Sequence, residues 1–379
     1  MNFELTAYQK EIQQRAREFA QKELLPTVID RDLHEVYDMG LLKKLGEAGL
    51  IGLQFDPKYG GHGNDYLAFI LVVEELCKVD SAFGISYAIS STFTTGIDLF
   101  ANEEQKMHCM PELFRGDAIG CFALTEPDAG SDAGSAKTTA TRDGDNFILN
   151  GKKHFITNGA IADYCMLIAN TDLSKGSKGL TAFLVDLKKT PGISIGQIEN
   201  KCGIRTAKVA EIIMDNAVIP ASRMIGTEGK GLRYALTSLN AGRLAVAAQG
   251  LGLSEGAFGI ARDYMMERVQ FGQPIYKNQY LAFRMADLKN EIDMAKLLLY
   301  RGVDLQQRGE DFSVAACQAK LACTNCAMHV TTECVQSMGG AGYMRENHVE
   351  RMFRDAKITQ IYEGTNEIQR MIISNAIFR

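Results

Sequence analysis

The hydrophobic pattern of this chain changes its period twice, and this change restricts the fold more than any other feature. Near the N-terminus, Leu42, Leu45 and Leu50 and the apolar run 67–77 recur at helical spacing. From about residue 119 to 227 the apolar runs are short and bounded by Gly, Asn and Asp, as in β-strands. Helical spacing then returns, with a second long helix predicted over 313–338. A doubly wound sheet would alternate strands and helices throughout, so this fold class is disfavoured.

These periods predict a mainly α chain with a central β domain, and a length of 379 residues suits more than one core. We expect an N-terminal helical domain over 1–118, a β domain over 119–228 and a C-terminal four-helix bundle over 229–379. The β domain is expected to be a small antiparallel barrel or sandwich. Its first hairpin is expected to turn at Asn150 and Gly151, because that pair lies between two apolar runs.

Charge and composition exclude several classes of function. The net charge is −5 without a basic cluster, which argues against nucleic-acid partners and polybasic membrane binding. No apolar run approaches the roughly 20 residues that span a bilayer, so membrane insertion is not expected. The first residues are charged and amphipathic and lack the apolar core of a signal peptide. We therefore expect a cytoplasmic protein.

The cysteines suggest two possible uses, a disulfide framework or a metal site. Their number, nine, is odd and they are scattered, which argues against a disulfide framework. Cys323, Cys326, His329 and Cys334 have spacing like that of a metal site. However, alanines fill the same segment at helical intervals, and no Gly or Pro interrupts it. A buried helix is therefore favoured, and we predict no metal.

Three glycines resemble part of a dinucleotide fingerprint. Gly250, Gly252 and Gly256 lie within a helical pattern and follow no strand, so a nucleotide-binding turn is disfavoured. Close packing of helices is the favoured interpretation.

Three glycine-bearing segments are candidates for ligand contact. Gly130 and Ser131 lie in a stretch of glycines and hydroxyls over 121–141, which presents backbone N–H groups; a flexible linker is the alternative. Arg268 precedes the aromatic-glycine pair Phe271 and Gly272, which suits a diphosphate or adenine, or alternatively a capped helix end. The third segment, 336–342, has the pattern Gly-Gly-x-Gly after a long predicted helix, which permits close backbone approach.

A carboxylate lies beside a glycine near the C-terminus. Glu363 precedes Gly364 and a predicted final helix. Two interpretations are open: a solvated acid favoured by the helix dipole, or a catalytic base. The residue alone does not decide between them.

Taken in order, these segments resemble the acyl-CoA dehydrogenase family over nearly the whole chain. ALTEPDAGSDAGS (123–135) and QSMGGAGYMRENHVERMFRD (336–355) resemble two signature segments of that family. KHFITNG, GKGLRYALTSLNAGR, RVQFGQP and IYEGTNEIQR occur in the family's order and spacing. Within the family, the sequence is most similar to short-chain, butyryl-CoA-type members.

The resemblance implies FAD bound between the β domain and the C-terminal bundle, in a homotetramer built as a dimer of dimers. It assigns contacts with FAD to Phe122, Leu124, Thr125, Gly130, Ser131, Phe155, Ile156, Thr157, Arg268, Phe271, Gln279, Gln336, Gly339, Gly340, Thr365 and Glu367. The segment from Gln336 to Gly340 would reach the cofactor of a neighbouring subunit. Substrate contacts would come from Ser131, Asn240, Arg243 and Gly364.

The chain departs from the family's pattern at two of these positions and at one neighbouring position. Many relatives have Trp where this chain has Phe155, and the chain contains no Trp. Relatives commonly have Asp where Asn240 stands. His154 occupies a position that is often apolar, and a solvent-facing strand residue is the favoured interpretation.

The resemblance also implies the chemistry. Glu363 would be the base that removes the α-proton of an acyl-CoA; branches that place this acid elsewhere use the position of Gly242 here. Because a thioester α-proton is weakly acidic, the base needs a raised pKa. The expected activity forms a trans-2-enoyl-CoA from a short-chain acyl-CoA and passes electrons to an electron-transfer flavoprotein. Alternatives are an enoyl-CoA or aryl-acrylyl-CoA reductase working with that flavoprotein, and a non-catalytic flavin or CoA-binding module.

Overall fold

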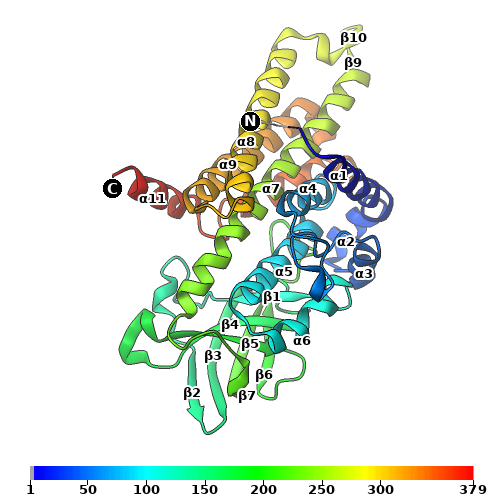
Figure 1. Cartoon of the computed structure of the whole chain (residues 1–379). Helices are drawn as coiled ribbons and strands as arrows, with labels where there is room; N and C mark the ends of the chain where they lie inside the picture. Colours follow the sequence, from blue (N-terminus) through cyan, green and yellow to red (C-terminus); the bar gives the residue numbers. More distant parts are fainter. Residues whose placement is uncertain (1–3, 379) are drawn as a thin grey trace.

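A β domain lies at one end of the molecule and helices at the other in the computed structural model, which describes residues 4–378 (Figure 1). The helices are α1 (Ala7–Phe19), α2 (Val28–His34), α3 (Met39–Glu47), α4 (Tyr66–Cys77), α5 (Ser81–Phe100), α6 (Glu103–Phe114), α7 (Gly231–Glu267), α8 (Gln279–Gln307), α9 (Ser313–Met338), α10 (Val349–Thr359) and α11 (Asn366–Ile377). Local side chains define several starts: Asp65 caps α4 by accepting from the Ala68 N–H, and Asp80 caps α5 in the same way.

The strands form one mixed sheet and a short hairpin. They are β1 (Gly120–Ala123), β2 (Thr139–Asp143), β3 (Asn146–Ile156), β4 (Tyr164–Asn170), β5 (Leu180–Asp186), β6 (Ile193–Ile198), β7 (Ala210–Pro220), β8 (Met224–Ile225), β9 (Val269–Gln270) and β10 (Gln273–Pro274). The sheet has the order β6-β7-β3-β2-β4-β5-β8, with β1 paired to β4. The mainly α architecture with a central β domain is confirmed. Two pairings, β1–β4 and β2–β4, are parallel, which the sequence pattern did not predict.

The predicted hairpin at Asn150 and Gly151 is wrong. Strand β3 continues through both residues, and its pairing with β7 shifts register between Leu149 and Gly151. Gly151 has a φ of +144°, a value that favours glycine. A bulge and a turn can both require such a residue, so glycine alone does not distinguish them. The hairpin turns instead between Asp143 and Asn146, where Gly144 has a φ of +57°.

The glycines of α7 allow it to approach its neighbours closely. A Cβ added at Gly250 would lie 2.8 Å from the carbonyl oxygen of Cys323 in α9, and one at Gly252 would lie 2.5 Å from that of Glu74 in α4. The predicted role of these glycines in helix packing is confirmed. By length and composition α7 could cross a membrane, but 72% of its most apolar window is buried, as in a core helix.

Helix α9 matches the predicted range 313–338 and buries its cysteines. Cys323, Cys326 and Cys334 are all buried, whereas His329 is exposed and lies 2.6 Å from Glu291 Oε2. Within residues 4–378, no group of three or more His, Cys, Asp or Glu side chains could hold a metal ion.

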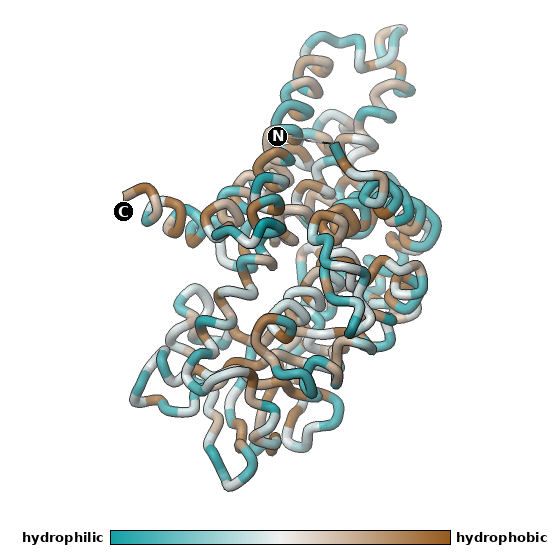
Figure 2. The backbone as a smooth tube through the Cα atoms, viewed as in Figure 1, coloured by the Kyte–Doolittle hydropathy of each residue, from teal (hydrophilic) through white to brown (hydrophobic). Residues whose placement is uncertain are grey.

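Apolar side chains also lie on the outside of the bundle. Figure 2 shows hydrophobic stretches on α11, which projects from the bundle at the C-terminus, whereas the tip of the β2–β3 hairpin is hydrophilic. The exposed large apolar residues of the C-terminal half include Phe271, Tyr280, Phe283, Tyr343, Met371, Ile377 and Phe378.

Candidate active site

Glu363 lies on a tight turn between α10 and α11. Glu363 and Gly364 both have left-handed backbone, with φ of +54° and +86°, which disfavours a non-glycine residue by roughly 1 kcal/mol. The Gln369 amide donates to the carbonyl oxygens of Glu363 (3.3 Å) and Gly364 (2.8 Å). Helix α11 starts directly afterwards, with Thr365 as its N-cap. The predicted position of Glu363 just ahead of a helix is confirmed.

The Glu363 side chain faces a cavity of about 190 Å³ between the β domain and the helices. The walls come from α5, the loop after β1, the end of β3, α7 and the α10–α11 turn. The lining residues are Ile89, Phe122, Leu124, Thr125, Gly130, Ser131, Ala133, Phe155, Ile156, Thr157, Leu236, Leu239, Arg243, Tyr362, Glu363, Gly364 and Ile368.

The Glu363 carboxylate is shielded although the residue borders a cavity. Its Oε2 atom is inaccessible to solvent and has no hydrogen-bond partner within residues 4–378. Burial raises the pKa of Glu363 to about 7, while the positive charges of Arg243 and Lys320 act to lower it. A Cβ added at Gly242 would lie 2.6 Å from this Oε2 atom, so the glycine makes room for the carboxylate. These features do not fit the solvated-turn alternative.

Arg243 extends from α7 into the same cavity wall. Its Nη1 donates to Asn240 Oδ1 at 2.6 Å, and its Nε is buried without a partner within the described chain. Asn240 lies one helical turn before Arg243 and does not line the cavity itself. In this structure Asn240 contacts the Arg243 guanidinium, and its predicted contact with substrate stays a prediction.

A buried lysine anchors the loop on the opposite wall. Lys153 of β3 is fully buried, and its Nζ donates to the Leu124 carbonyl oxygen (3.0 Å) and to Glu126 Oε1 (2.7 Å). Glu126 also accepts from the backbone N–H groups of Lys137 (2.7 Å) and Thr138 (3.0 Å). These bonds contradict the flexible-linker alternative for this segment.

Phe155 presents an aromatic face to the cavity. It has a φ of +57° and is 60% exposed, which is unusual for a large apolar residue. The ring of His154 lies 3.7 Å from that of Phe155, centroid to centroid, and its Nδ1 lies 3.1 Å from Glu211 Oε1. His154 is therefore a half-buried partner of Glu211 and not a freely solvated strand residue.

The other predicted cofactor residues lie elsewhere in the chain. Arg268 and Phe271 belong to the β9–β10 hairpin and Gln279 begins α8, at the end of the bundle remote from the β domain (Figure 1). Gln336 lies in the last turn of α9, and Gly339 and Gly340 belong to the short 3-10 helix that directly follows it. Thr365 and Glu367 border a separate polar cavity of about 180 Å³ with Lys357 and Arg370. One chain does not bring all these groups together.

Several cavity residues were not predicted from the sequence. They are Ile89, Ala133, Leu236, Leu239, Tyr362 and Ile368. Lys320, which acts on Glu363 from α9, was also missed. The one available signal was a single lysine inside an otherwise small and apolar helical pattern.

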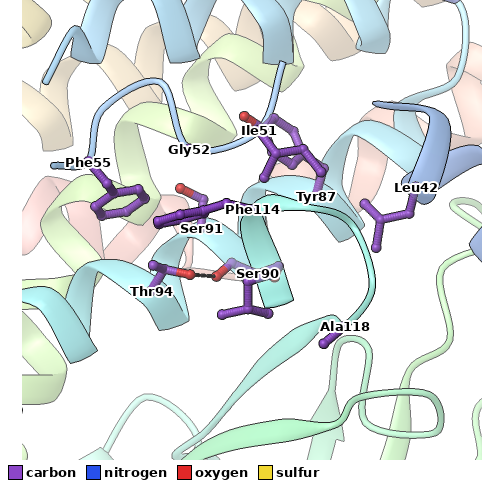
Figure 3. A pocket seen from close by; sticks show the side chains of 11 residues that line it. Leu42, Ile51, Gly52, Phe55, Tyr87, Ser90, Ser91, Thr94, Phe114 and Ala118 are labelled. Atoms are coloured by element: carbon purple, nitrogen blue, oxygen red, sulfur yellow. Dashed lines mark hydrogen bonds between the residues drawn. The ribbon is translucent and has the colours of Figure 1, made fainter. Parts of the chain in front are cut away.

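A second cavity lies beside α5, and Figure 3 shows it lined by Ser90, Ser91 and Thr94 beneath the loop at Ile51 and Gly52. Its volume is about 10 Å³, which is space for roughly one water molecule. Ile89, on the same helix, belongs to the Glu363 cavity. The Glu363 cavity is therefore the better candidate for binding an organic substrate.

Comparisons with known proteins cover almost the whole chain. Family models match residues 6–117 (Acyl-CoA dehydrogenase, N-terminal domain), 121–217 (middle domain) and 229–378 (C-terminal domain). The short-chain specific acyl-CoA dehydrogenase of Clostridium acetobutylicum is 44% identical over 380 residues, which cover 100% of both sequences.

Two solved structures are similar over their full length. Butyryl-CoA dehydrogenase from Megasphaera elsdenii has a TM-score of 0.98 and 43% identity, with 100% of both chains covered. A chain in the structure of the electron transferring flavoprotein of Acidaminococcus fermentans, from work on flavin-based electron bifurcation, has a TM-score of 0.98, 45% identity and the same coverage.

Proposed function

The chain belongs to the acyl-CoA dehydrogenase family, and from that premise we propose that Glu363 is the base that removes the α-proton of a short-chain, butyryl-CoA-like thioester. The family consists of oxidoreductases that act on CH–CH bonds. The observation that carries the proposal is a shielded carboxyl group in a cavity, with a pKa raised to about 7. A base with this pKa is matched to proton transfer near neutral pH.

A flavin is the cofactor of this family, and we propose that here it is FAD. The cavity suits a flat ring: Phe155 offers an exposed aromatic face, and Gly130 has open space where a side chain would stand. The loop residues Leu124 and Thr125 are fixed by the anchor from Lys153. A flavin held by these residues would supply the acceptor for the β-hydrogen, which leaves the substrate as a hydride.

Residues of the chain itself would carry out the other steps: removal of the α-proton, contact with the thioester oxygen and exclusion of water. Glu363 takes the α-proton, and its backbone N–H, which has no acceptor within residues 4–378, is available to the thioester oxygen. Arg243 places a positive charge beside the carboxylate and so favours its ionised form. Leu236, Leu239 and Ile368 give the cavity an apolar wall, against which bound substrate would displace water from the reacting carbons.

The electron partner and the direction of the reaction are part of the proposal. The likeness to a chain solved with the Acidaminococcus flavoprotein supports an electron-transfer flavoprotein as partner. A carboxyl group with a pKa of about 7 can also return the proton, so reduction of an enoyl-CoA or aryl-acrylyl-CoA uses the same residues. Anaerobic titration with saturated and unsaturated acyl-CoAs, followed by flavin absorbance, separates the two directions.

We further propose a cytoplasmic homotetramer. Phe271 is fully exposed at the β9–β10 hairpin, and Tyr280 and Phe283 are exposed nearby on α8. Large exposed apolar side chains of this kind mark interfaces. A neighbouring copy would bring Arg268 and Gln279 to a flavin that one chain contacts only from the Glu363 side. Sedimentation of the purified holoprotein tests this assembly.

The decisive experiment is Glu363→Gln. We expect the variant to retain bound flavin and to bind acyl-CoA, but to lose bleaching of the flavin by butyryl-CoA by at least about 100-fold. The matched control is Glu104→Gln, which changes an exposed carboxylate in the first turn of α6 and should bleach normally. Normal bleaching by Glu363→Gln would show that the base is another residue.

A further inference from the structure

A lysine of α9 is fully buried beneath the turn that carries Glu363. The Nζ atom of Lys320 donates to the Gly364 carbonyl oxygen (2.9 Å) and to Asn366 Oδ1 (2.9 Å). Both acceptors are uncharged, and the carboxylates of Glu363 and Glu367 act on the Lys320 ammonium group through space, without a hydrogen bond to it. A buried ammonium group without a paired carboxylate is strongly disfavoured, so its presence requires a reason beyond hydrogen bonding.

A neutral donor already serves the same carbonyl group. The amide of Gln369 is fully buried and donates to the Gly364 oxygen at 2.8 Å. Two donors therefore bind the Gly364 carbonyl oxygen. The Lys320 amine can carry a charge, whereas the Gln369 amide cannot. What Lys320 adds is the charge, and of the two carboxylates whose charge acts on it, Glu363 has a stronger effect than Glu367.

Of the ionisable groups of residues 4–378 that act on Glu363 or Lys320, these two themselves have a pKa near neutral pH. Arg243 of α7 stays positive. Burial keeps Cys317 of α9 and Tyr362 protonated by raising the pKa of both groups, and Glu367 at the start of α11 is exposed and stays negative. Burial lowers the pKa of Lys320 to about 7 and raises that of Glu363 to about 7. A proton gained by Glu363 can thus be balanced by a proton lost from Lys320.

We propose that Lys320 is a positioning residue for the reaction: it holds the Gly364 carbonyl group and balances the charge of Glu363 as that carboxylate takes up and returns its proton. This role rests on the proposed function, in which Glu363 is the base. Lys320 does not line the cavity, so it acts through Glu363 and not on the substrate.

The test compares Lys320→Met with Gln369→Met. Each variant removes one donor from the same carbonyl group, but only the first removes a positive charge. The measurement is the pH profile of flavin bleaching by butyryl-CoA, in which activity falls on the acid side as Glu363 becomes protonated. For Lys320→Met we expect this acid limb to move up by about one pH unit, and the rate at pH 7 to fall roughly fivefold. For Gln369→Met we expect a lower rate with the acid limb unmoved.

Lys320→Arg tests the charge independently, including the case in which Lys320→Met does not fold. It retains a positive charge, so its acid limb should stay within a few tenths of a pH unit of the unmodified protein. An acid limb that moves in Lys320→Arg, or moves equally in Lys320→Met and Gln369→Met, overturns the charge-balancing role.

Glu363→Gln separates this proposal from the one on which it rests. If that variant still bleaches, the assignment of the base fails and the role of Lys320 fails with it. If it does not bleach and the acid limb of Lys320→Met is unmoved, only the role of Lys320 fails.

Discussion

The Glu363 cavity and the β9–β10 hairpin differ in how completely one chain builds them. At the cavity, the left-handed Glu363 turn is held by two fully buried donors, Lys320 and Gln369. At the hairpin, Phe271 and Gly272 also have left-handed backbone, with φ of +51° and +77°, yet Phe271 is fully exposed. Apart from the adjacent residues, no atom of residues 4–378 lies within 4 Å of a Cβ added at Gly272.

The difference indicates whether each region can act within one chain or needs a partner. A strained turn that is held by buried contacts keeps its conformation within a single chain. A strained turn that presents an exposed aromatic ring needs an outside partner, which the proposed neighbouring copy and its flavin would supply. Substitutions should therefore affect chemistry in the first region and cofactor retention in the second.

The largest expected effect in this contrast belongs to Gly242→Ala. The added Cβ would lie 2.6 Å from Glu363 Oε2, the flexible end of a side chain that can move aside, and 3.2 Å from Thr92 Oγ1, which needs to shift by only a few tenths of an ångström. A displaced base costs about 100-fold in rate, because proton transfer depends on position at the scale of 1 Å. We expect kcat to fall by about this factor while flavin content and Tm stay close to those of the unmodified protein.

Gly259→Ala is the matched control for that change. It makes the same substitution in the same helix, α7, at a position where the added Cβ meets no atom within 4 Å in the described chain apart from the adjacent residues and the nearby backbone of α7. It should leave kcat unchanged. Equal kcat values for the two variants would mean that the Glu363 carboxylate does not work from the position against Gly242.

The contrast also explains how far sequence reasoning could go. The range 313–338 was predicted as the bounds of α9, because apolar residues recur there at helical spacing without a breaker. The hairpin turn predicted at Asn150 and Gly151 was wrong, because a bulge and a turn can both contain a residue with positive φ. The local hydrophobic pattern therefore predicted the bounds of helix α9 better than the position of the hairpin turn.

In the candidate site, too, the residues that stand in a recognisable local pattern were the ones that the sequence predicted. Glu363 and the loop with Gly130 were predicted because each stands in a recognisable segment. Lys320 was not, since its contact with Gly364 joins residues that are 44 positions apart and no local pattern connects them. Leu236 and Leu239 were missed for a similar reason: a leucine in a helix predicts burial but not what it faces.

Phe271→Ala tests the exposed region. The residue makes no buried contact within its own chain, so the stability of the isolated subunit should not change. If Phe271 packs on a flavin in the assembled protein, loss of the ring should weaken FAD retention about tenfold. The measurement is flavin released on dilution, with Leu173→Ala, an exposed apolar side chain of the β domain, as control. Unchanged retention in Phe271→Ala would exclude the hairpin from the cofactor site.

The smallest expected effect comes from Gly272→Ala, which changes the shape of the hairpin but not its aromatic ring. Gly272 has a φ of +77° and open space around it, so alanine is disfavoured by backbone strain alone, about 0.5–1 kcal/mol. If that strain loosens how Phe271 is presented, FAD retention should weaken by about threefold. Gly309→Ala introduces the same strain at a φ of +68°, also in open space, between α8 and α9. It should leave retention unchanged, so an equal effect of the two variants would assign the change to general loosening of the bundle and not to the hairpin.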